Sequence, residues 1–187
     1  MQRMLIPLLL LSVLFGGCAV ADDADGPDSP PEQSMEDRQE GTDIALNMEI
    51  LKRGTQGALA SDIDSEQHSE PFIEIASDHS TLRSLWDQYI GRGDVPSVSF
   101  DRSIVAFLLM PAQPTGGYSI DPEGISATGG TVEIDATIRR PGPNDIVTQA
   151  FTAPYAVIAV EQVDPESVEA VEWMDQGRRV ATRSVEP

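Results

Sequence analysis

The 187-residue sequence has a single cysteine, two histidines and 12 basic residues against 31 acidic ones, for a formal net charge of −19. One cysteine excludes an internal disulfide, so the folded part depends on a packed core for its stability. So few basic residues exclude nucleic acid as a partner, because phosphate backbones are bound by basic surfaces. The histidines, His68 and His79, lie eleven positions apart without a ligand spacing, and we expect no metal site and no cofactor.

The N-terminal apolar run, residues 4–15, is shorter than the roughly twenty apolar residues that span a bilayer. Arg3 precedes it, and two glycines and Cys18 follow it, which is the layout of a secretory signal. A cysteine directly after two small residues resembles a bacterial lipoprotein signal, although Phe15 stands where the usual leucine is expected. The sequence therefore predicts that residues 1–17 are removed and that Cys18 carries lipid. An ordinary cleaved signal with an unpaired thiol is the alternative.

Lipid on Cys18 would hold the mature protein on a membrane surface, because each buried methylene group of an acyl chain contributes about 0.8 kcal/mol. We therefore expect the protein in the bacterial cell envelope, in contact with the bilayer through Cys18 only. Ala19 follows the cysteine in place of aspartate, which resembles an outer-membrane sorting signal in a cell with two membranes.

Residues 18–43 have the composition of a disordered linker, with nine acidic residues, one arginine and three prolines. Such a segment buries too little apolar area to offset the entropy of ordering it. We interpret it as a spacer between the lipid and the folded part. A calcium-binding acidic tail is the alternative, but no ligand spacing supports it.

The remaining residues, 44–187, are predicted to form a single globular domain that is mainly β, an antiparallel sheet or sandwich with one short helix packed on it. Alternating apolar residues predict strands over 44–51, 72–75, 103–110, 119–126, 132–139, 147–152 and 155–160. The segment 103–110 is apolar on both faces, so we expect it to be a central strand with the helix covering one face.

The helix is predicted over about residues 80–90, after candidate N-cap residues at 77–80. Its apolar side chains recur at the spacing of one helical face, at Leu82, Leu85, Trp86 and Tyr89. The two aromatic residues are interpreted as core, with a binding role as the alternative. After Asp164 the pattern fits either a helix or a terminal hairpin around Gly177, and the sequence leaves this choice open.

Two short motifs stand out in the strand-rich part of the chain. The first is Pro114, Thr115, Gly116, Gly117 and Tyr118, and the second consists of Thr148, Gln149, Pro154 and Tyr155. Together they resemble the C-terminal domain of the PrcB family of protease-complex subunits, in which a strand precedes a P-T-G-G-Y turn and a later segment reads roughly T-Q-x-x-T-x-P-Y. The PrcB-like core is identified as residues 103–162, about a third of the chain.

The resemblance implies a surface lipoprotein with no chemistry of its own, which serves as an accessory or stabilising subunit of an exported protease or envelope complex. It also implies that both motifs take part in binding the protein partner. The alternative is structural. Gly116 and Gly117 can serve a tight turn with positive φ, and Tyr118 and Tyr155 can pack beneath it.

The same turn supports a second binding function. The stretch from Gln113 to Tyr118 is similar to the N-P-T-T-G-Y loop that chagasin-type inhibitors present to the cleft of a cysteine protease. It departs from that loop at Gln113, which replaces asparagine, and at Gly116, which replaces a threonine. An inhibitor of cysteine proteases is therefore the runner-up.

No catalytic residue is predicted. No serine lies in a G-x-S-x-G elbow, Cys18 stands at the lipid site, and a carboxylate pair carries no signal in a chain this acidic. A small envelope hydrolase or ligand-binding module remains the third alternative. It would require His79 beside a buried carboxylate in a cleft.

Overall fold

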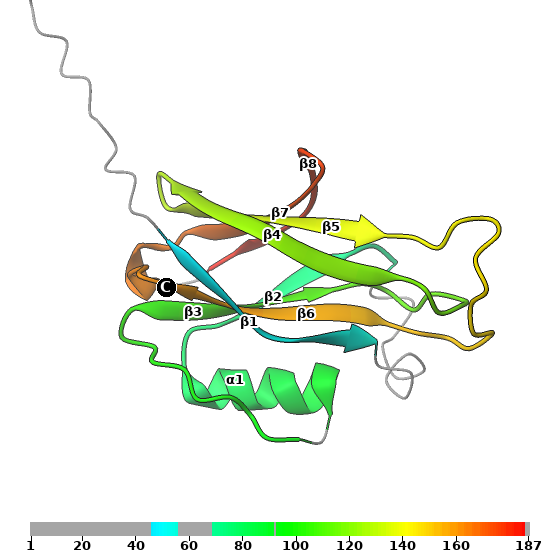
Figure 1. Ribbon diagram of the computed structural model, residues 1–187. Helices are drawn as coiled ribbons and strands as arrows, with labels where there is room; N and C mark the ends of the chain where they lie inside the picture. Colours follow the sequence, from blue (N-terminus) through cyan, green and yellow to red (C-terminus); the bar gives the residue numbers. More distant parts are fainter. Residues whose placement is uncertain (1–45, 56–68, 92, 186–187) are drawn as a thin grey trace, which may run out of the picture. The chain divides into compact units, whose positions relative to one another are not determined.

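The residues that the structure describes form eight strands, which build two four-stranded β-sheets that pack face to face around a shared apolar core (Figure 1). The computed structural model describes residues 46–55, 69–91 and 93–185, which belong to one compact unit. The predicted lipid site at Cys18, the linker and the boundary at residue 44 lie outside the described residues. Among the residues described, no helix is long and apolar enough to cross a membrane.

The first sheet has the strand order β1-β6-β3-β2, and all its pairings are antiparallel. Its strands are β1 (Asn47–Thr55), β2 (Phe72–Ala76), β3 (Ser103–Leu109) and β6 (Pro154–Glu161). Every residue of β3 is buried, which confirms the predicted central strand. One face of β3 packs into the core between the sheets, and the other packs under the helix.

The second sheet has the order β4-β5-β7-β8. Its strands are β4 (Ser119–Thr128), β5 (Thr131–Arg139), β7 (Ala170–Asp175) and β8 (Arg178–Ser184). We expected antiparallel pairing, but β5 and β7 are parallel. The reason is that β6 carries the chain back along the first sheet, so β7 starts beside the beginning of β5 and runs in the same direction.

The core between the sheets contains the buried face of β5, with Val132, Ile134, Ala136 and Ile138, as its alternation predicted. Trp173 on β7 is completely buried there. Its indole N–H donates to the carbonyl oxygen of Ala136 over 2.7 Å, so the largest side chain of this core leaves no unpaired polar atom.

The predicted helix covers the outer face of the first sheet (Figure 1). It begins as α1 (His79–Leu85) after Asp78, whose carboxylate accepts from the backbone N–H groups of Ser80 and Thr81. It continues as a π-helical turn, η2 (Trp86–Ile90), and Gly91 follows with a φ of 84°. The wider turn lets the neighbouring residues Tyr89 and Ile90 both be buried, together with Trp86, and this confirms the core interpretation of the two aromatics.

One predicted segment differs from the structure, and one choice that the sequence left open is decided by it. The segment 147–152 is not a strand, because it lies beyond the ends of both sheets; it has a single bridge, between Thr152 and Gln113. The end of the chain forms the hairpin β7–β8, preceded only by the 3₁₀ turn η3 (Pro165–Ser167). The strand predicted over 44–51 is seen as β1, which is described from Asn47 and extends further, to Thr55.

Ion pairs join the edges of the two sheets on both sides. Arg53 of β1 lies 2.9 Å from Asp121 of β4, and Arg183 of β8 lies 3.2 Å from Glu74 of β2. The edge strands β1 and β4 also carry β-bulges, which interrupt their backbone ladders. These features leave the edges poorly suited to pairing with a strand of another protein.

Candidate protein-binding site

The two motifs, about thirty residues apart in the sequence, meet at one end of the sheets. The backbone N–H of Gly116 donates to the carbonyl oxygen of Thr148 over 2.9 Å. Gln113 and Thr152 exchange two backbone hydrogen bonds of 2.6 and 3.0 Å, and the Thr152 hydroxyl donates to the carbonyl oxygen of Thr115 over 2.9 Å. The first motif therefore supports the second.

The surroundings of the two glycines in the first motif leave little room for a side chain. A Cβ on Gly116 would overlap the hydroxyl of Thr148, and Gly116 is buried. Gly117 has a φ of 88°, and a Cβ there would lie 2.8 Å from a methyl carbon of Val147 and 3.0 Å from Pro141. The motif turn thus has a structural role, whatever it does for a partner.

Tyr118, Pro154 and Tyr155 are buried or half-buried. Pro154 and Tyr155 begin β6 and are buried, and burial raises the pKa of the Tyr155 phenol. The carbonyl oxygen of Pro154 accepts from the N–H of Met110 over 3.0 Å. Tyr118 is half-buried against the core between the sheets. Among the predicted site residues, Pro114, Gly117, Thr148 and Gln149 are the exposed ones.

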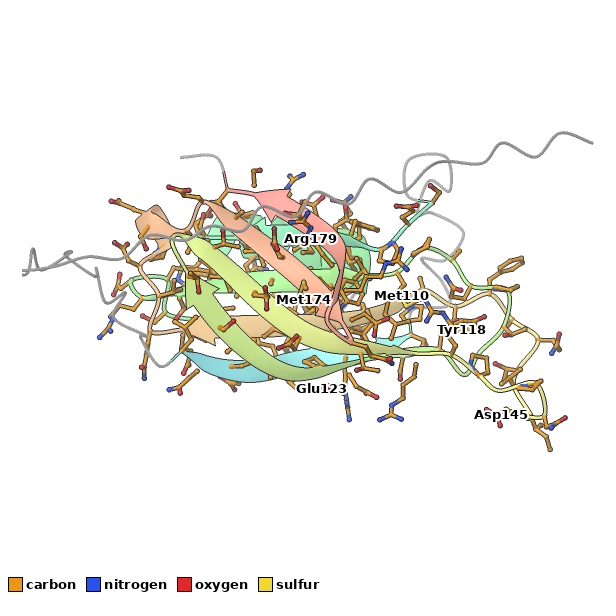
Figure 2. The ribbon with its side chains drawn as sticks, turned by 90° about the horizontal axis from the view of Figure 1, so that it is seen from above. Met110, Tyr118, Glu123, Asp145, Met174 and Arg179 are labelled. Carbon is orange, nitrogen blue, oxygen red and sulfur yellow. The ribbon has the colours of Figure 1, made fainter. Side chains whose placement is uncertain are left out.

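We call residues 140–153 the arm. The arm leaves β5 after Arg139 and projects beyond the ends of the strands before it enters β6 (Figure 1). Asp145 lies near its outer end (Figure 2) and closes a tight turn. Its carboxylate accepts from the N–H of Gly142 over 2.8 Å, and its own N–H donates to the carbonyl oxygen of Gly142 over 3.1 Å.

Two large apolar side chains are exposed on the arm. Ile146 is fully exposed and Phe151 is 66% exposed. Among the described residues, the only other large apolar side chain with such exposure is Ile50 on β1, at 42%. The hydrogen bonds of Gly116 and Gln113 hold the backbone on which Ile146 and Phe151 stand, so these side chains face solvent from a fixed base.

Charged side chains gather beside the arm. Asp121 on β4 accepts from Arg53 and from Arg139, and this contact raises the pKa of the Arg139 guanidinium. Arg140 is exposed and makes no hydrogen bond or ion pair with any described residue. The base of the arm therefore presents one uncommitted positive charge.

The structure places His79 away from this site, at the start of α1. Its ring is exposed and packs edge-on against Phe100, with 4.9 Å between ring centroids. In the parts of the chain that are described, no group of three or more histidine, cysteine or acidic residues is arranged to hold a metal ion.

The sequence did not single out Ile146 and Phe151 as candidate site residues. The strand predicted over 147–152 would have placed Phe151 in an alternating pattern with one face buried. The available signal was the Pro141-Gly142-Pro143 run, which isolates the following residues from β5 and leaves them without a neighbouring strand.

These features define a β-sandwich module with a supported loop that exposes two large apolar side chains. The family model described as PrcB C-terminal matches residues 104–161, from β3 to the end of β6. This match confirms, for residues 104–161, the resemblance that the two motifs predicted. The matched segment contains both motifs and the whole arm. Searches of curated proteins and of solved structures found no match.

Proposed function

We propose that this protein is a membrane-anchored bacterial lipoprotein whose β domain binds another protein and catalyses no reaction. Its role is that of an accessory or stabilising subunit of an exported protease or another envelope complex. Lipid on Cys18 holds it at the envelope, in the outer membrane where the cell has two membranes, and residues 18–43 separate the lipid from the domain.

The exposure of Ile146 and Phe151 on the supported arm carries this proposal. Exposing two large apolar side chains of a loop to water is unfavourable in the isolated protein. Burying both against a partner would contribute about 3–6 kcal/mol, which corresponds to an affinity gain of at least a hundredfold. The closed edges of both sheets favour the arm over strand addition as the way in which a partner binds.

The family match supports a protease complex as the partner. PrcB C-terminal domains take their name from a protease complex, and the matched segment includes the entire arm. The inhibitor alternative has less support, because Gly116 is buried beneath Thr148 and Gln113 is paired with Thr152. These contacts cover part of the turn, so it has less free surface for insertion into a protease cleft than an uncovered loop would have.

Cross-linking in living cells tests the proposal. The full chain is produced in its native host with Ile146→Ser and Phe151→Ser together, and with Ile50→Ser as the control for loss of an exposed apolar residue. We expect partners captured by the parent chain and by Ile50→Ser to be lost from the double variant, without a change in its melting temperature. Capture that is equal for all three chains would contradict a role of the arm.

A further inference from the structure

We infer that the arm recognises a protein surface on which apolar side chains are bordered by carboxylates, with Arg140 contacting the carboxylates and Ile146 and Phe151 the apolar part. This inference depends on the proposed function, which it makes more specific. It rests on the distribution of charge around the arm.

The arm and its first neighbour carry positive charge in a strongly acidic chain. Residues 139–153 contain two arginines and one aspartate, a net charge of +1, whereas the whole chain has a net charge of −19. The aspartate, Asp145, directs its carboxylate back to the N–H of Gly142. A partner that covers the arm therefore meets arginine at its base and an acid that is already hydrogen-bonded.

Of the two arginines at the base of the arm, Arg140 is the one without an ion pair among the described residues. Arg139 and Arg53 both bind Asp121, and Arg179 binds Glu172 over 2.6 Å. Arg140 follows Arg139 directly, is exposed, and has no such pair within the described residues. Arginine at the rim of an apolar contact can bind a carboxylate through two parallel hydrogen bonds, which gives orientation as well as affinity.

Four acidic groups of the domain lie at its opposite end, whereas at the arm's end Asp121 is paired with two arginines and Asp175 accepts from the N–H of Ile138. Asp101, Asp164, Glu166 and Glu169 are grouped around one shallow cleft near the start of β5, since Glu169 donates its N–H to the carbonyl oxygen of Gly130. The nine residues of β5 separate that end from the arm by roughly 25–30 Å. Physiological salt screens charges beyond about 8 Å, so the four acids around this cleft do not prevent a contact between Arg140 and a carboxylate of the partner.

A protein surface fits the arm better than a lipid surface does. Binding to an anionic bilayer grows with the number of basic residues that reach it, and the arm offers one free arginine on a chain that such a bilayer repels. Two apolar side chains on a hydrogen-bonded base also suit a shaped pocket, where their separation is matched, more than a fluid interface.

An unbiased selection of displayed random peptides tests the inference. Three baits are used, each the mature chain from residue 18 with Cys18→Ser. The first has no other change, the second also carries Ile146→Ser and Phe151→Ser, and the third also carries Arg140→Glu. Arg178→Glu is the matched control, because Arg178 is exposed and makes no ion pair with described residues. We expect the selected peptides to combine acidic and large apolar residues. Arg140→Glu should weaken them about tenfold and Arg178→Glu should leave them unchanged.

The outcomes separate this inference from the proposed function. Peptides that require Ile146 and Phe151 but are basic or neutral, and that tolerate Arg140→Glu, would overturn the charge preference and leave the binding role of the arm intact. Absence of any arm-dependent peptide would overturn both. Sedimentation of the same chain with vesicles of anionic phospholipid, lost in the double serine variant, would show a lipid-binding arm and overturn the inference.

Discussion

Gly116 donates its backbone N–H to the carbonyl oxygen of Thr148, and the Thr148 hydroxyl occupies the space that a side chain at position 116 would need. This contact joins the two motifs of the PrcB-like segment. The residues between the two motifs comprise β4, β5 and the first part of the arm, which together return the chain to the turn.

The first prediction concerns this contact. Gly116→Ala should destabilise the protein by about 1–3 kcal/mol, because the added methyl group overlaps the Thr148 hydroxyl. Thr148→Ala should relieve most of that cost in the double variant. Chemical unfolding measures the free energies, and limited proteolysis reports on the arm. Gly142→Ala is the control, since its Cβ would lie 3.4 Å from Asp145, an ordinary contact distance. An equal cost of Gly116→Ala with and without Thr148 would contradict the contact.

The second prediction compares the two tryptophans. Trp173→Phe removes a hydrogen bond to Ala136 and leaves a cavity, whereas the indole N–H of Trp86 has no hydrogen-bond partner among the described residues. Both side chains are buried. We expect Trp173→Phe to cost about 1–2 kcal/mol more than Trp86→Phe in thermal or chemical unfolding. Equal losses would mean that the bond from Trp173 contributes nothing net.

The third prediction concerns the pH dependence of the helix start. Hydrogen bonds from Ser80 and Thr81 lower the pKa of the Asp78 carboxyl well below its usual value of 3.8. Its stabilisation is therefore fully present above about pH 4 and is lost as the pH falls toward the lowered pKa of the folded state. Asp78→Ala should cost about 1 kcal/mol at pH 7 and less with each step below pH 4.

Unfolding of both chains by urea between pH 7 and pH 2 checks this. The control is Asp87→Ala, because Asp87 is an exposed aspartate on the same helical segment that makes no capping contact. A difference between the parent chain and Asp78→Ala that stays constant with pH would contradict the role of the carboxylate charge.

The fourth prediction tests the lipid anchor. Cys18→Ser removes the thiol to which lipid would attach, so the protein should move from the membrane fraction to the soluble fraction. Mass spectrometry of the parent chain should show an acylated N-terminal cysteine. Ala19→Ser, which leaves the thiol, should keep the protein on membranes. Sedimentation of Cys18→Ser with membranes would mean that something other than lipid holds the protein there.

The sequence predicted those strands in which apolar residues on one face alternate with polar residues on the other. In β5, each apolar residue from Val132 to Ile138 is buried, because alternation along a strand directly encodes which face meets the core. In β3 both faces are apolar, which is enough to indicate a strand between a second sheet and a helix. The helix start at Asp78 was also predictable, since capping is a local interaction.

The amino-acid sequence by itself determined the mainly β character of the domain, the central position of β3, the helix that covers it and the PrcB-like character of residues 104–161, because these depend on local periodicity and on short motifs. Only the tertiary structure decided that residues 147–152 lie outside both sheets and that Ile146 and Phe151 are both exposed. It also decided that β7 joins β5 in parallel. A strand requires a neighbour to complete its hydrogen bonds, and that neighbour is supplied by distant parts of the chain whose return path local sequence does not encode.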